Sequence, residues 1–109
     1  VNDIKYTTNS AEISKTSEFI LDELIEFMTE NPKVKIRIEG HTDNVGNTQE
    51  NMVLSNDRAF TVMGYLQDKG IAGSRLAFKG LGPTVPLKSN DTEAGRAENR
   101  RTEFVIIGL

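Results

Sequence analysis

The chain has 109 residues, of which 37% are hydrophobic and 27% are charged, a composition typical of an ordinary globular protein. Its formal net charge of −3 argues against nucleic acid as a partner, because phosphate binding normally needs a basic surface. The absence of cysteine excludes disulfides, thiol catalysis and zinc–thiolate sites. No apolar run approaches the ~20 residues that a transmembrane helix needs, so we expect no direct membrane contact by this chain.

We expect residues 1–109 to form a single domain, because this length is sufficient for one hydrophobic core. Residue 1 is valine, and no charged-then-apolar leader follows it. We therefore expect any targeting segment or membrane anchor to lie outside this fragment.

The first part of the chain alternates strand and helix patterns. Residues 3–6 give a weak strand signal, and residues 14–30 carry apolar side chains at helical spacing with acidic side chains opposite. Asn31-Pro32 ends this helix, because the residue before a proline disfavours helical dihedral angles. In residues 34–40, valine and isoleucine alternate with charged residues, which predicts a half-buried strand.

A second helix is predicted over residues 48–69, with Gly70 as a left-handed cap just beyond it. Its apolar stripe is formed by Leu54, Val62, Tyr65 and Leu66. At about 100° per residue, Asn51 and Arg58 fall in the middle of that stripe. A guanidinium on an apolar face must be paired or border a cavity, because its unpaired burial costs several kcal/mol.

The last part of the chain predicts two more strands. Residues 75–81 form a short strand, residues 82–90 a long loop punctuated by proline, and residues 101–107 an apolar closing strand. The predicted order is β-α-β-α-β-β. It indicates a two-layer α/β (α+β) sandwich, with the helices packed on one face of a mixed sheet.

Asp43 follows the strand of residues 34–40 and is an available anionic partner for Arg58. One interpretation is a structural ion pair at a helix edge, which contributes little at a surface. The other is a small polar pocket, because Asn51 lies within about 20° of Arg58 around the helix and adds a neutral amide. Such a trio can hold a zwitterion: the carboxylate takes an ammonium, and the guanidinium takes a carboxylate. An amino-acid head group has that charge layout.

The sequence predicts no catalytic or metal centre. His41 is the only histidine, and we interpret it as a hydrogen-bonded side chain at a strand end. No second histidine or suitable partner spacing indicates a metal site, and no nucleophile motif is present. We therefore expect no enzymatic activity and no cofactor.

Asn99-Arg100-Arg101 precedes the last predicted strand. A solvated basic patch is one interpretation of these residues. Alternatively, one of the arginines joins the polar pocket. Neighbouring residues of a strand face opposite sides, so only one of Arg100 and Arg101 can do so. Arg96, on the preceding turn, is placed to brace the loop instead.

Several segments together carry a family resemblance. They are Asn9-Ser10-Ala11, residues 38–43 (Ile-Glu-Gly-His-Thr-Asp), Leu54-Ser55, Arg58-Ala59, Gly70-Ile71, Arg75-Leu76, Gly80-Leu81-Gly82, Pro86, Asn90, Gly95-Arg96 and Asn99-Arg100-Arg101. In order, spacing and flanks, they resemble the OmpA-like peptidoglycan-associated domain found in OmpA C-terminal domains, the Pal lipoprotein and the flagellar stator protein MotB. The resemblance covers essentially the whole chain.

The resemblance implies non-covalent binding of peptidoglycan, chiefly through the meso-diaminopimelate residue of its stem peptide. Asp43 is then expected to meet the ammonium of the free amino-acid end, and Arg58 its carboxylate. The same resemblance implies polar contacts from Asn51 and Arg100, and loop contacts near Thr42, Asn44 and Asn9.

A domain of this family is expected in the periplasm, where it anchors an outer-membrane or envelope protein to the cell wall. The alternative is a periplasmic stator or scaffold module that acts mainly through protein contacts or dimerisation. A peptidoglycan-cleaving enzyme is not expected, because the sequence has no coupled nucleophile, base or metal set. The loops of residues 44–50 and 82–90 vary among relatives, and both are expected to border the pocket.

Overall fold

The computed structural model describes residues 13–109. The elements are, in chain order, α1 (Lys15–Glu30), β1 (Lys35–His41), α2 (Thr48–Asp68), the 3-10 turn η1 (Gly73–Arg75), β2 (Leu76–Gly82), α3 (Glu93–Asn99) and β3 (Arg101–Gly108). The strand predicted at residues 3–6 lies outside the described residues. Within them, no helix combines the length and apolar character that membrane crossing requires.

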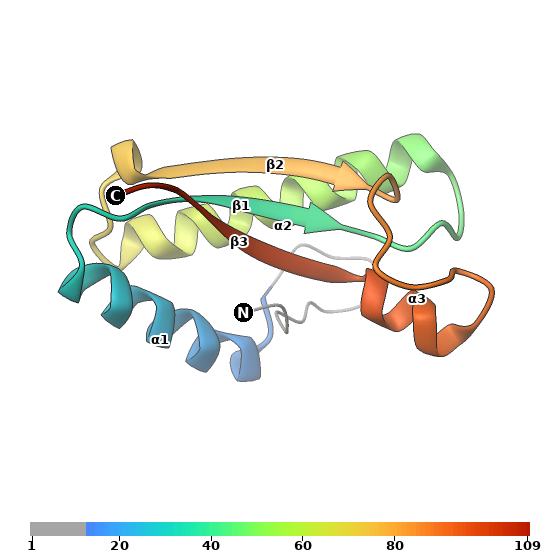
Figure 1. Cartoon of the computed structure of the whole chain (residues 1–109), viewed down its shortest axis with the longest axis horizontal. Helices are drawn as coiled ribbons and strands as arrows, with labels where there is room; N and C mark the ends of the chain where they lie inside the picture. The colour runs from blue at the N-terminus through green and yellow to red at the C-terminus, as the bar shows by residue number, and fades with distance from the viewer. Residues whose placement is uncertain (1–12) are drawn as a thin grey trace.

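The three described strands form one mixed sheet in the order β2-β1-β3, in which β1 is parallel to β2 and antiparallel to β3. Ile36 and Ile38 share one face of β1 and are buried against side chains from both long helices. The buried apolar core consists of Leu21, Met28, Val34, Ile36, Ile38, Ala59, Val62, Leu66, Ile71 and Leu76. The predicted α+β arrangement, with α1 and α2 covering one face of a mixed sheet, is confirmed (Figure 1).

The ends of the long helices follow local sequence signals. Ser14 caps α1, and its side chain accepts a hydrogen bond from the Ser17 amide at 3.3 Å. After α2, Gly70 has a φ of +102°, a conformation that glycine adopts without steric cost. The Ile71 amide then donates to the Leu66 carbonyl at 3.1 Å, which confirms the predicted cap.

Two glycines allow α2 to approach the sheet closely. A Cβ at Gly40 would lie 2.3 Å from the Ser55 carbonyl oxygen, and a Cβ at Gly80 would lie 2.4 Å from the Asn56 amide nitrogen. Ser55 is fully buried, and its hydroxyl accepts a hydrogen bond from the Gly82 amide at 2.9 Å. These contacts fix the N-terminal half of α2 beside the carboxyl ends of β1 and β2.

The buried face of α2 differs from the predicted stripe. It consists of Ser55, Ala59, Val62 and Leu66, whereas the predicted members Leu54 and Tyr65 are only half-buried. Measured around the helix, Asn51 and Arg58 lie about 60° from the centre of this face. Both side chains are half-buried at its border, so their predicted position in the middle of the apolar stripe is wrong. The small residue Ser55 is buried because the glycine contacts bring the backbones together.

The sequence patterns predict a turn before β3, but the structure has the helix α3 there. It has seven residues and no apolar stripe, so a periodicity search gives no signal for it. The signal was at its start, where the Thr92 hydroxyl accepts a hydrogen bond from the Gly95 amide at 3.0 Å and Glu93 lies in the first turn. Figure 1 shows α3 at the end of the sheet where β1 and β2 finish and β3 begins.

Candidate functional site

The loop that follows β1 holds the Asp43 carboxylate in a defined orientation. The Thr42 amide donates to the Gly82 carbonyl at 2.9 Å, which ties the loop to the end of β2. The Thr42 hydroxyl donates to the Asp43 carbonyl at 2.8 Å, and the Val45 amide donates to Asp43 Oδ1 at 3.0 Å. The Asp43 side chain is therefore fixed by local hydrogen bonds and is only 11% exposed.

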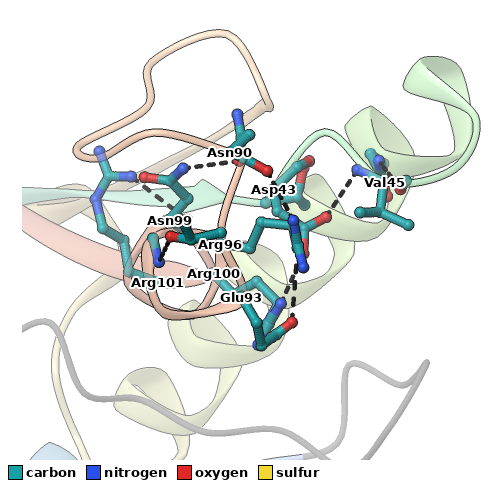
Figure 2. Close-up of polar contacts among 12 residues, drawn as sticks. Asp43, Val45, Asn90, Glu93, Arg96, Asn99, Arg100 and Arg101 are labelled. Atoms are coloured by element: carbon teal, nitrogen blue, oxygen red, sulfur yellow. Dashed lines mark hydrogen bonds and ion pairs between the residues drawn. The ribbon is translucent and has the colours of Figure 1, made fainter.

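Asp43 is joined to α3 through Arg100. Arg100 Nη1 donates to Asp43 Oδ2 at 2.7 Å, and Arg100 Nη2 donates to Glu93 Oε1 at 2.6 Å (Figure 2). The bonds to Glu93 and then to Asp43 raise the pKa of Arg100 above its ordinary value. The same contact with Arg100 lowers the pKa of Glu93. One guanidinium thus bridges two carboxylates, and three charged groups meet at the end of the sheet.

Of the other predicted ligand-binding residues, Asn44 lies in the same loop and Asn51 contacts that loop from α2. Asn51 Nδ2 donates to the Val45 carbonyl at 2.9 Å, so this amide braces the loop from α2. Arg58 lies two turns further along α2 and is half-buried, while Asn44 is exposed at the loop surface. Asn9 lies outside the described residues. Within residues 13–109 the cation paired with Asp43 is Arg100, a position that the sequence interpretation gave to Arg58.

The loop of residues 82–90 is held by one buried amide. Asn99 is fully buried, and its Oδ1 accepts from the Leu87 and Lys88 amides at 2.7 and 3.0 Å. Its Nδ2 donates to the Lys88 carbonyl and to Asn90 Oδ1. Arg96 Nη1 donates to the Asn90 carbonyl at 2.8 Å, which confirms that Arg96 braces this loop, from α3 and not from a turn. Figure 2 shows Asn99 and Asn90 directed at each other.

Arg100 and Arg101 point to different partners, although Arg100 is the C-cap of α3 and lies just before β3, so strand alternation does not apply to it. Arg101 is only 4% exposed, so a solvated basic patch is the wrong interpretation for this residue. Its Nη2 donates to the Val85 carbonyl at 3.0 Å and to Glu103 Oε2 at 3.1 Å. Arg100 alone of the two joins Asp43.

His41 lies in a group that could hold a metal ion. Its ligand atoms and those of Glu39 and Glu103 lie within 4.8 Å of one another. Residues 39 and 41 share a face of β1, but Glu103 comes from β3, where it is paired with Glu39. Because Glu103 is distant in the sequence, spacing along the chain does not indicate this group. Burial and the nearby Arg101 guanidinium lower the pKa of His41, which favours the neutral imidazole.

The charges around His41 are already balanced. Glu39 pairs with Arg37 at 2.7 Å, and Glu103 pairs with Arg101 at 3.1 Å. A divalent cation at this place would lie beside two guanidinium groups, and the resulting repulsion opposes its binding. His41 Nε2 lies 3.0 Å from Glu103 Oε2, and this contact opposes the lowering of the His41 pKa by burial and Arg101. We interpret the group as a structural charge network.

The fold and this arrangement of charges define a small α+β binding domain. A model of the OmpA family matches residues 5–100, and the chain belongs to the OmpA family. Membership places it among non-catalytic domains, in agreement with the prediction that it is not an enzyme.

Three relatives illustrate the match. The chain is 34% identical to a probable lipoprotein, YiaD, of Escherichia coli over 108 residues, which cover 99% of this chain and 49% of the relative. It is 37% identical to the peptidoglycan-binding protein ArfA of Mycobacterium tuberculosis over 103 residues, which cover 94% of this chain and 32% of the relative. The crystal structure of the peptidoglycan-associated lipoprotein from Burkholderia pseudomallei superposes with a TM-score of 0.86 at 25% identity, covering 94% of this chain and 87% of that one. The chain therefore spans half or less of the two curated relatives.

Proposed function

We propose that this domain binds peptidoglycan non-covalently through the diaminopimelate residue of its stem peptide. In the bound state the Asp43 carboxylate takes the ammonium of the free amino-acid end, and the Arg58 guanidinium takes its carboxylate. Asn51 and Arg100 add polar contacts, and we expect further contacts with the ligand from Thr42, Asn44 and Asn9.

The observation that carries this proposal is the Asp43 carboxylate. It lies two residues beyond the end of β1, is only 11% exposed, and accepts one hydrogen bond from the Val45 amide and one from Arg100. A carboxylate fixed in this way is preorganised for a cation and loses little freedom on binding. The names of ArfA and of the peptidoglycan-associated lipoprotein support peptidoglycan as the ligand of this chain.

The proposed place of action is the periplasm, where the domain anchors an outer-membrane or envelope protein to the cell wall. Two relatives support this location: the probable lipoprotein YiaD and the outer membrane porin F of Pseudomonas fluorescens. A head group of this size binds modestly at one site, whereas a sacculus offers many linked sites and hence avidity.

Cosedimentation with purified sacculi tests the proposal. Arg58→Ala is expected to lower the affinity about tenfold to a hundredfold, the effect of losing one charged hydrogen-bonded pair. Arg58→Lys keeps the charge but loses the bidentate geometry. Its affinity is expected to lie between that of the wild type and that of Arg58→Ala. Lys33→Ala is a charge-matched control, because Lys33 is exposed in the turn before β1, at the opposite end of that strand from Asp43 (Figure 1).

Far-UV circular dichroism of each variant checks that the fold is retained. Binding by Arg58→Ala that equals binding by the wild type contradicts the role assigned to Arg58. Failure of the wild-type domain to sediment with sacculi contradicts the function itself. The alternative of a scaffold module that acts through protein contacts would then take its place.

A further inference from the structure

The Arg100 bridge, defined as the chain Asp43–Arg100–Glu93, has a consequence for how a ligand enters. Asp43 Oδ1 accepts from the Val45 amide, and Oδ2 accepts from Arg100. Since the carboxylate is only 11% exposed, little of its surface is left for a second cation. An ammonium arriving beside Arg100 would also be repelled by the guanidinium charge. The ammonium and Arg100 therefore compete for the same oxygen.

We propose that Arg100 occupies, in the free domain, the place on Asp43 that the ammonium of the ligand takes, and that Glu93 retains Arg100 after the exchange. This inference rests on the proposed function and names a positioning residue that nothing in the sequence indicated. The Glu93 side chain is 65% exposed and lies at the start of α3, seven residues before Arg100. Arg100 is the C-cap of the same helix, and its Nη2 reaches Glu93 Oε1 at 2.6 Å.

The exchange accounts for a preference between head groups. Arg100 keeps its Nη2 bond to Glu93 when Nη1 leaves Asp43. Nη1 then needs a new acceptor, and a guanidinium matches a carboxylate best. A ligand end that carries both an ammonium and a carboxylate replaces both lost contacts. An end with an ammonium alone replaces only one, and leaves Nη1 to water.

Glu93 controls the exchange because it shares Arg100 with Asp43. With Glu93 present, the displaced guanidinium still has a carboxylate partner. Without Glu93, Asp43 is the only described carboxylate paired with Arg100. Displacement from Asp43 then leaves the Arg100 guanidinium without a carboxylate partner among the described residues. Removal of the Glu93 charge is therefore expected to make Arg100 a stronger competitor.

Calorimetric titration with two soluble stem tetrapeptides tests the exchange. One carries meso-diaminopimelate at its third position and the other carries L-lysine, so the two differ by the carboxylate at the free end. Arg100→Ala is expected to bind the lysine tetrapeptide about twofold to fivefold more tightly than the wild type, because the competing ion pair between Arg100 and Asp43 is removed. The ratio of the diaminopimelate affinity to the lysine affinity is expected to fall by about fivefold, because the ligand carboxylate keeps Arg58 but loses its second guanidinium contact, the one with Arg100.

Glu93→Gln is expected to weaken binding of the lysine tetrapeptide about twofold, and to have no effect when combined with Arg100→Ala. Glu98→Gln is the control, because Glu98 is an exposed carboxylate on the same helix. The exchange is contradicted if Arg100→Ala binds the lysine tetrapeptide more weakly than the wild type. It is also contradicted if Glu93→Gln weakens binding of that tetrapeptide as much in the Arg100→Ala variant as in the wild type. Failure of the wild-type domain to bind either tetrapeptide overturns the proposed function instead.

Discussion

The close contact between α2 and β1 makes Gly40→Ala the most informative change to the fold that supports the site. A Cβ at Gly40 would lie 2.3 Å from the Ser55 carbonyl oxygen, whereas ordinary van der Waals contact begins at 3.4 Å. The obstacle is backbone, so it cannot rotate away as a flexible side chain could. The helix would have to move outward by about 1 Å, and such overpacking typically costs about 1–3 kcal/mol.

Gly64→Ala on α2 is the matched control, because a Cβ there meets no atom of the described residues within 4 Å. That substitution is expected to stabilise the helix by roughly 0.5–1 kcal/mol, since alanine loses less backbone entropy than glycine. Urea denaturation gives the free energy of unfolding of both variants. Thermal unfolding should show Gly40→Ala about 5–20 °C below the wild type, given about 4–8 °C per kcal/mol at this size.

The same movement displaces Arg58 relative to the loop that holds Asp43. Gly40→Ala is therefore expected to lose affinity for sacculi even below its melting temperature, because binding of a head group depends on sub-ångström positions. Gly64→Ala should bind as the wild type does. An unchanged free energy of unfolding in Gly40→Ala would refute the close approach from which this reasoning starts.

Two further changes test the surroundings of the site. Asn99→Ala removes the buried amide that binds the loop of residues 82–90. Urea denaturation should show a free energy of unfolding lower by roughly 2–4 kcal/mol. A loss below about 0.5 kcal/mol would contradict the structural role of Asn99. The pKa of His41 is lowered from 6.5, so the unfolded chain binds more protons than the folded one, and stability is expected to fall as the pH drops below about 6.5. His41→Gln should lose that part of the pH dependence between pH 7.5 and 5.5, and an identical dependence in both proteins would contradict the assignment.

Periodicity predicted the elements that are long enough to show it. Both long helices and the three described strands begin and end within about two residues of their predicted positions, because apolar spacing and caps are local signals. Helix α3 carries no such pattern, since its seven residues are held by Thr92, by Asn99 and by the loop of residues 82–90. Local sequence could indicate its cap but not its packing.

The site was predicted less completely than the fold. The sequence predicts Asp43 because the Arg58 guanidinium needs an anionic partner, and it predicts Asn51 because this residue shares a helix face with Arg58. The pairing of Asp43 with Arg100 depends on contacts between residues 57 positions apart. It follows from the antiparallel pairing of β1 with β3, in which His41 lies opposite Arg101, and a single sequence does not specify that register.

The measurement that tests the central claim most directly is a titration of the ¹⁵N-labelled domain with meso-diaminopimelate, followed by amide chemical shifts. The proposal predicts saturable shifts at residues 42–44, Asn51, Arg58 and Arg100, and their loss in Asp43→Asn. Asn at this position keeps the shape and the Val45 contact but removes the charge that an ammonium needs. Absence of shifts with both diaminopimelate and soluble muropeptide, or equal shifts in Asp43→Asn, would contradict the assignment of Asp43 as the ammonium-binding group.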